Sequence, residues 1–277
     1  MYYKHESVLL ASKHQKEKAI AEVFFNKLSF TLCVQDFDTD QFGTFTGDIP
    51  RTLSPYDTCV LKARAAMAHY SYELGLASEG SFGPHPAIPF VPSAHEIMVF
   101  VDRKNEWTIA EELLCLKTNY NNILVNKETP LDEFLKQVGF PEHALILQTN
   151  TSKTVIAKGI RDLDTLHAAL DQGFKKDNPL FLATDMRAMM NPTRMGTLKE
   201  LADKLATRIA TCCPKCEVPG FGFKKTQGNL PCSLCNASTS FYKQEVWGCI
   251  QCHYQEHHSR KDGLQEADPS HCDYCNP

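Results

Sequence analysis

The stretch DTCVLKARAAMAHYSYELGLASEGSFG, residues 57–83, decides the fold class of this chain. Apolar residues recur at helical spacing through its first half, which predicts an amphipathic helix that begins at Ser54-Pro55. Residues 74–78 then form a short apolar strand, and Glu79 follows it in a glycine-rich turn. A helix that leads into a buried strand is the repeating unit of an α/β fold.

The same alternation continues on both sides of this stretch. Further strands are expected at residues 7–12, 29–35, 96–102, 143–149, 155–160 and 180–184. Helices are expected between them, at residues 19–28, 131–139, 162–173 and 198–209. We therefore expect an α/β domain over residues 1–210, with a mixed or mainly parallel sheet and flanking helices.

The bulk composition excludes several classes of protein. Hydrophobic residues make up 43% and charged residues 22% of the 277 residues, and the net charge is −4. Such a balance argues against a general nucleic-acid or anionic-membrane binder. No apolar run approaches the roughly 20 residues that a membrane span needs, and the N-terminus does not look like a signal peptide. We expect a cytoplasmic protein without a membrane partner.

Twelve cysteines are present, and most of them lie near the C-terminus. Eight form C-x-x-C pairs after residue 211: Cys213 and Cys216, Cys232 and Cys235, Cys249 and Cys252, Cys272 and Cys275. Two such turns supply four thiolates to a tetrahedral zinc ion, so residues 211–277 are expected to form a small zinc-ribbon module with two structural zinc sites. Sequential pairing, in which the first turn shares a site with the second and the third with the fourth, fits the spacings. Nested pairing, in which the two outer turns share one site and the two inner turns the other, is also possible.

Two roles for the cysteine module stay open. Zinc can fold a segment that is too poor in apolar residues to fold alone. The module can also bind RNA or a protein partner, although its six Lys/Arg and seven Asp/Glu are not the basic balance of a phosphate-backbone reader. Closed sites of four cysteines argue against catalytic zinc, which keeps an open position.

Acidic and basic residues in the N-terminal half form a second candidate site. Asp57 and Glu79 are predicted to hold Mg²⁺, which favours a few carboxylates together with water and substrate phosphates. Lys62 would bind phosphate, and Asp40 in the preceding loop would supply a base. The plainer alternative is that Asp57 only complements the helix N-terminus.

A phosphate-binding site is predicted at the junction between the first strand and the first helix. The segment SKHQKEK, residues 12–18, follows a strand and opens a helix. Backbone N–H groups at a helix start, together with lysines such as Lys16, favour a bound phosphate.

These motifs resemble those of the inosine/xanthosine triphosphate pyrophosphatases. VLLASKHQKEKAI resembles their strand, T/S-x-N-x-x-K turn and helix, with Ser12 at the T/S place and His14 at the Asn place. DTCVLKAR resembles their E-N-A-x-x-K-A-R helix, and LASEGSFG resembles their acidic turn. The resemblance implies that Asp57 and Glu79 hold Mg²⁺, that Lys16 and Lys62 bind the triphosphate, and that water attack releases pyrophosphate.

Three arginines complete the predicted substrate-binding residues. The base-recognition and S-H-R motifs of those enzymes have no clear counterpart, and ATDMRAMMNPTRM, residues 183–195, lies near that place in the chain. Arg187 and Arg194 are therefore expected to play a related part, and Arg51 to bind phosphate.

A closer resemblance covers nearly the whole chain. DTDQFGTFTGDIPR, LASEGSFGPHP, ATDMRAMMNPTRM and the cysteine tail that ends in CDYCNP are similar to an uncharacterised, mainly bacterial domain-of-unknown-function family. That family supplies no activity. The leading prediction is a Mg²⁺-dependent hydrolase of a nucleoside triphosphate or a related phosphorylated small molecule, and the alternative is a non-enzymatic zinc-ribbon adaptor for RNA or a protein partner.

Overall fold

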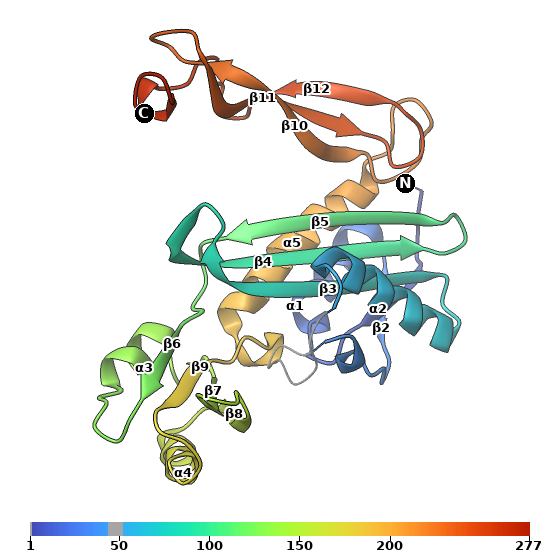
Figure 1. Cartoon of the computed structure of the whole chain (residues 1–277). Coiled ribbons are helices and arrows are strands. Elements are labelled where there is room, and N and C mark those ends of the chain that lie inside the picture. Colours follow the sequence, from blue (N-terminus) through green and yellow to red (C-terminus); the bar gives the residue numbers. More distant parts are fainter. Residues whose placement is uncertain (1, 44–51) are drawn as a thin grey trace. The chain divides into compact units, whose positions relative to one another are not determined.

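The structure is a computed structural model that describes residues 2–43 and 52–277 (Figure 1). The chain separates into two compact units. The first is the α/β unit, Tyr3–Ala206, and the second is the cysteine unit, which holds Thr207–Pro277 together with Tyr2. No helix among the described residues is long and apolar enough to cross a membrane.

A five-stranded sheet forms the centre of the α/β unit, in the order β2-β1-β3-β4-β5. Its strands are β1 (Ser7–Ala11), β2 (Thr31–Val34), β3 (Leu74–His85), β4 (Ile88–Asp102) and β5 (Trp107–Cys115). β1 runs parallel to both β2 and β3, whereas β3, β4 and β5 are antiparallel. The predicted α/β fold with a mixed sheet is confirmed.

Helices cover both faces of this sheet. On one face, α2 (Pro55–Tyr70) packs its apolar side, including Cys59, Ala63 and Met67, against β1, β3 and β4. α1 (Glu17–Leu28) covers the opposite face, where Phe24 stacks on Phe30 and Phe30 stacks on Phe100. α5 (Pro192–Ala210) lies beside α1, and Lys27 of α1 forms an ion pair with Asp203 of α5.

The sequence prediction fails at the glycine-rich segment after residue 78. It was expected to be a turn that holds Glu79, but β3 runs on to His85 and pairs with β4 along this whole length. Glu79 therefore lies within the strand, opposite Ile97. β1 ends at Ala11, opposite Ala77, so β3 extends past the end of β1 from Ser78 onward.

A smaller antiparallel sheet, in the order β6-β9-β7-β8, follows in the same unit. Its strands are β6 (Asn122–Val125), β7 (Leu145–Thr149), β8 (Val155–Ile160) and β9 (Leu180–Thr184). The helices α3 (Asp132–Val138) and α4 (Leu163–Gly173) enclose its apolar core, in which Leu145, Leu147 and Leu182 are buried. β9 leads through the short 3₁₀ helix η2 (Ala188–Met190) into α5.

The cysteine unit is built on a three-stranded antiparallel sheet, in the order β10-β11-β12. Its strands are β10 (Gly222–Pro231), β11 (Ser238–Gly248) and β12 (Gln255–Ser259), and the short 3₁₀ helix η3 (Pro269–His271) follows. The four C-x-x-C turns alternate with these strands along the chain. Each strand therefore joins two cysteine turns.

Candidate functional site

A small cavity opens at the carboxyl end of β1, where β3 continues past β1 and stays paired with β4. Its volume is about 50 Å³. Most of the predicted site residues line it: Ser12, His14, Lys16, Asp40, Lys62, Glu79 and Arg194. The carboxyl ends of parallel strands are the usual place for ligands in open α/β sheets, so the position of this cavity agrees with its chemistry.

Lys16 is the most unusual of these residues. It stands just before α1 and is only 7% exposed, and its Nζ donates to the Ser78 carbonyl at 2.8 Å and to Ser78 Oγ at 2.9 Å. No carboxylate of the described residues lies within ion-pair distance of this ammonium. Burial and the positive charge of Arg194 together lower the pKa of Lys16 to about 8, although the carboxylates of Glu79 and Glu96 act against this shift.

Lys62 is equally buried, at 7% exposure, but it has a carboxylate partner. It projects from α2 and forms an ion pair with Glu79 of β3, which is also buried. This pair joins the two residues that the helix motif and the acidic motif singled out in the sequence. Four cations line the cavity, and two others are also paired, Lys13 with Asp38 and Arg194 with Glu96. Among the described residues, Lys16 is the one of the four without an ion pair.

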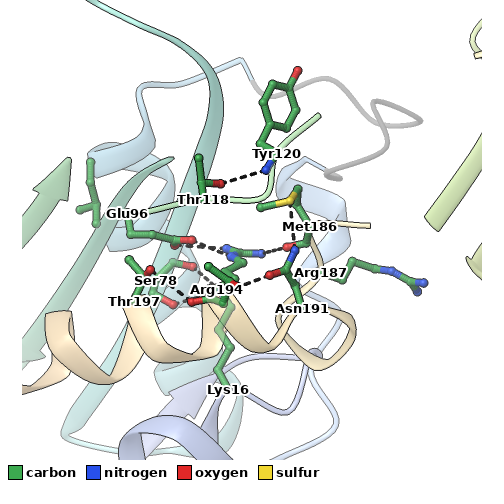
Figure 2. Close-up of polar contacts among 12 residues, drawn as sticks. Lys16, Ser78, Glu96, Thr118, Tyr120, Met186, Arg187, Asn191, Arg194 and Thr197 are labelled. Carbon is green, nitrogen blue, oxygen red and sulfur yellow. Dashed lines mark hydrogen bonds and ion pairs between the residues drawn. The ribbon is translucent and has the colours of Figure 1, made fainter. Parts of the chain in front are cut away.

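Arg194 is held by a network that the sequence did not reveal (Figure 2). Its Nε donates to Glu96 Oε1 at 2.6 Å, its Nη2 to Glu96 Oε2 at 3.2 Å, and its Nη1 to the Met186 carbonyl at 2.5 Å. Gly80 makes room for this network, because a Cβ there would lie 2.6 Å from Arg194 Nη2 and 2.7 Å from Glu96 Oε1. This glycine therefore serves a close approach and not a turn.

Burial and neighbouring charge also act on His14, which lines the same cavity. Burial lowers the pKa of His14 to about 4, and the charges of Lys16 and Arg194 act in the same direction. His14 is therefore neutral at pH 7. For both His14 and Lys16 the largest cause of the lowered pKa is burial, and the neighbouring positive charges add to it.

Two of the predicted residues, Asp57 and Arg187, do not line the cavity. Asp57 is exposed on the first turn of α2 and does not line the cavity; its N–H donates to Ser54 Oγ at 3.1 Å, and Ser54 Oγ donates to its carboxylate at 2.6 Å. Ser54 is the N-cap of α2, and the Asp57 carboxylate lies in the first turn, where it complements the helix N-terminus, as the plainer alternative held. Arg187 is paired with Asp185 at 2.5 Å, and its side chain points away from Arg194 (Figure 2). Arg51 lies outside the described residues.

The cysteine unit contains two groups of four cysteines that could each hold a metal ion. One group is Cys213, Cys216, Cys249 and Cys252, and the other is Cys232, Cys235, Cys272 and Cys275. The first turn is thus combined with the third, and the second with the fourth. Both pairings considered from the sequence, sequential and nested, are wrong. Cys212 and the four histidines of this segment belong to neither group.

Strand direction explains this interleaved pairing. Antiparallel strands place the start of β10 and the end of β11 at one end of the sheet, and the end of β10 and the start of β11 at the other. Cysteine turns that alternate with the strands must therefore alternate between the two ends. Sequential pairing would require turns separated by the length of β10, about 30 Å, to share one ion.

The thiol groups are already arranged for a metal. Sulfur atoms of different turns approach to 3.5 Å between Cys216 and Cys249 and to 3.6 Å between Cys235 and Cys272. The backbone N–H groups of Cys235 and Leu234 lower the pKa of Cys232 to about 7, whereas hydrogen bonding with Cys235 raises the pKa of Cys275 in the same group to about 12. Both groups are compatible with tetrahedral zinc.

The fold and its two sites define an α/β protein with a cationic cavity and a C-terminal unit of two cysteine tetrads. Comparison with family models places the chain in the family described as a domain of unknown function (DUF6671), whose model matches residues 62–277. The chain belongs to this family. No curated protein sequence matches it, so the resemblance to the triphosphate pyrophosphatases stays a prediction.

Proposed function

We propose that the α/β unit is a hydrolase that binds the phosphate of a phosphorylated small molecule in the cationic cavity. The buried ammonium of Lys16 is the observation that carries this proposal. A buried cation without a carboxylate partner is costly to the fold, and a bound phosphate would supply the missing negative charge. The start of α1 directly after Lys16 adds a partial positive charge on the same side.

The size of the cavity supports a phosphate and not a larger group. About 50 Å³ holds roughly three to five water-sized groups, which matches a single phosphoryl group. Lys16 and Lys62 would bind its oxygens, and Arg194, fixed by Glu96, would lie beside them in the cavity lining. A nucleotide could place only its phosphate here.

Glu79 and Asp40 both line the cavity and are the carboxylates that would hold Mg²⁺ together with phosphate oxygens. When bound, such an ion would neutralise phosphate charge and acidify a water molecule. The neutral imidazole of His14 could accept a hydrogen bond from the attacking water or donate one to a phosphate oxygen. Asp57 takes no part in this proposal, because it is exposed on the first turn of α2 and does not line the cavity.

A wider groove offers a place for the rest of the substrate. It has a volume of about 520 Å³ and is lined by apolar residues such as Phe82, Pro84 and Leu114 and by the polar pair His95 and Glu112. Gly83 of this groove lies four residues along β3 from Glu79, or about 13 Å. A nucleoside phosphate has the length to reach both places, so nucleotides are the first substrates to test.

We further propose that the cysteine unit holds two zinc ions with a structural role. Each group would supply four thiolate ligands to one zinc ion. No coordination position would then be left for water or substrate, which catalytic zinc requires. The expected stoichiometry is two zinc ions per chain.

The test of the hydrolase is release of phosphate and pyrophosphate from a panel of nucleotides, with and without Mg²⁺. Glu79→Gln should abolish turnover, and Asp57→Asn, a matched carboxylate change outside the cavity, should retain it. Because Glu79→Gln disturbs a buried ion pair, Lys16→Met serves as a second inactivating variant that should keep the fold. Turnover that survives Lys16→Met would refute the proposal, and saturable pyrophosphate binding without turnover would reduce it to a binding protein.

A further inference from the structure

The two cysteine tetrads differ in the residues that they expose. The comparison concerns the third residue of each C-x-x-C turn, which stands directly before the second cysteine. In the tetrad that contains Cys213, these residues are Lys215 and Gln251, and both are exposed and polar. In the tetrad that contains Cys232, they are Leu234 and Tyr274, which are 72% and 80% exposed.

This contrast within one unit shows that folding does not require the apolar pair. Lysine and glutamine occupy the equivalent turn positions at the other tetrad, so a cysteine turn of this kind accepts polar residues there. Leu234 and Tyr274 belong to turns that converge on one tetrad, so they share one end of the sheet. Leu234 and Tyr274 are thus two large apolar side chains that are exposed to solvent at the same end of the sheet. Such a pair indicates an interaction surface.

The charge around this surface identifies the kind of partner. Residues 262–277 contain four acidic residues and no lysine or arginine, whereas residues 211–261 contain six basic and three acidic residues. Asp262 is paired with Arg260, and the Asp268 carboxylate accepts the Ser270 N–H. Glu266 and Asp273 are exposed and have no ionic partner among the described residues.

We propose that Leu234, Tyr274 and the surrounding acidic residues form a docking site for a basic amphipathic segment of a partner protein. The apolar pair would contact the apolar face of that segment, and Glu266 and Asp273 would attract its lysines or arginines. The same acidic charge would repel a nucleic-acid backbone, so this end of the cysteine unit favours a protein over RNA. The proposal concerns a different unit from the hydrolase and does not depend on it.

The test uses the zinc-loaded full chain and two fluorescent synthetic helical peptides. Both carry the same leucine face, one with lysine and the other with glutamate on its polar face, and binding is followed by fluorescence anisotropy. The lysine peptide should bind saturably, and the glutamate peptide at least tenfold more weakly. The double variant L234K/Y274Q, which copies the polar residues of the other tetrad, should weaken binding of the lysine peptide at least tenfold.

Two controls accompany this test. The double variant K215A/Q251A changes the other tetrad and should leave peptide binding unchanged, and both variants should still hold two zinc ions per chain. Peptide binding that L234K/Y274Q does not weaken would overturn the proposal. So would binding of a single-stranded RNA, or self-association in sedimentation velocity, that L234K/Y274Q abolishes, because the occupant would then be RNA or a second copy.

Discussion

Replacement of Lys16 by methionine should stabilise the α/β unit at pH 7, which is an unusual outcome for a buried position. Lys16→Met keeps the length of the side chain and removes its charge. The matched control is Lys62→Met. The two lysines are equally exposed, at 7%, but only Lys62 is paired with a buried carboxylate, Glu79. They therefore differ in partner and not in burial.

The expected magnitude follows from the pKa of Lys16. Its ordinary value is 10.5, and in the folded protein it is about 8. A difference of about 2.5 units corresponds to about 3 kcal/mol against folding at pH 7. Methionine removes this penalty but leaves the two Ser78 oxygens without their donor, which costs about 1 to 2 kcal/mol. The net gain should be about 1 to 2 kcal/mol.

The pH dependence gives the sharper signature. Because the pKa of Lys16 is lowered on folding, the unfolded chain binds more protons between about pH 8 and pH 10.5. The wild-type unit therefore gains about 3 kcal/mol from this group as the pH rises through that window, whereas Lys16→Met does not. The variant should be the more stable protein at pH 7 and the less stable one at pH 10.5.

Urea denaturation at a series of pH values measures this difference. Trp107 lies in the α/β unit and Trp247 in the cysteine unit, so a Trp247→Phe background assigns the fluorescence to the α/β unit. Lys62→Met should lower the free energy of unfolding by about 3 to 5 kcal/mol, because it removes the partner of a buried carboxylate. The reasoning would be wrong if Lys16→Met destabilised the unit at pH 7 and if the free energies of unfolding of wild type and variant did not cross as the pH rises. Other groups would then compensate the charge of Lys16.

Further perturbations test the cavity and the metal groups. The affinity of the wild-type chain for pyrophosphate, divided by that of Lys16→Met, should stay level below pH 8 and fall by up to tenfold per pH unit above it, as Lys16 loses the proton that the anion requires. This ratio removes the effect of the ionisation of pyrophosphate itself. Isothermal titration calorimetry measures it, and a ratio that does not change with pH would contradict the prediction. Gly80→Ala should cost about 1–3 kcal/mol of stability by urea denaturation, because its Cβ would overlap the arginine–glutamate pair behind the cavity. Among cysteine-to-serine variants, the double change at Cys213 and Cys249 should leave one zinc ion per chain, and that at Cys213 and Cys232 should leave none, as counted by metal analysis. The reverse counts would indicate sequential pairing.

Local sequence signals were enough to predict how part of the cavity is assembled. Ser12, His14 and Lys16 stand where a strand gives way to a helix, and this junction has to lie at the carboxyl edge of a parallel sheet. Lys62 and Glu79 belong to a consecutive helix and strand, which pack against each other for the same reason that any βαβ unit does.

Other features depend on contacts that no local pattern records. Glu96 supports Arg194 from a position 98 residues away, and its place at the edge of an apolar run looks like an ordinary strand boundary. The glycine-rich segment around Gly80 has the composition of a turn, but pairing with β4 makes it a strand. The interleaved cysteine pairing was hidden because β10 has seven consecutive exposed residues and shows no alternation.

The two proposals rest on the same kind of reasoning, which is comparison of matched positions within one molecule. Lys62 shows that this cavity can bury an ammonium group together with a carboxylate counterion. The fold therefore does not require Lys16 to be without such a counterion. Lys215 shows that a cysteine turn accepts a polar residue, so the exposure of Tyr274 is not imposed by metal binding. Lys16 makes the fold less stable, and Tyr274 makes the surface less soluble. A bound ligand could compensate for each of these costs. Stability alone would remove both features, so binding of an anion and of a basic segment is the simplest physical reason for their presence.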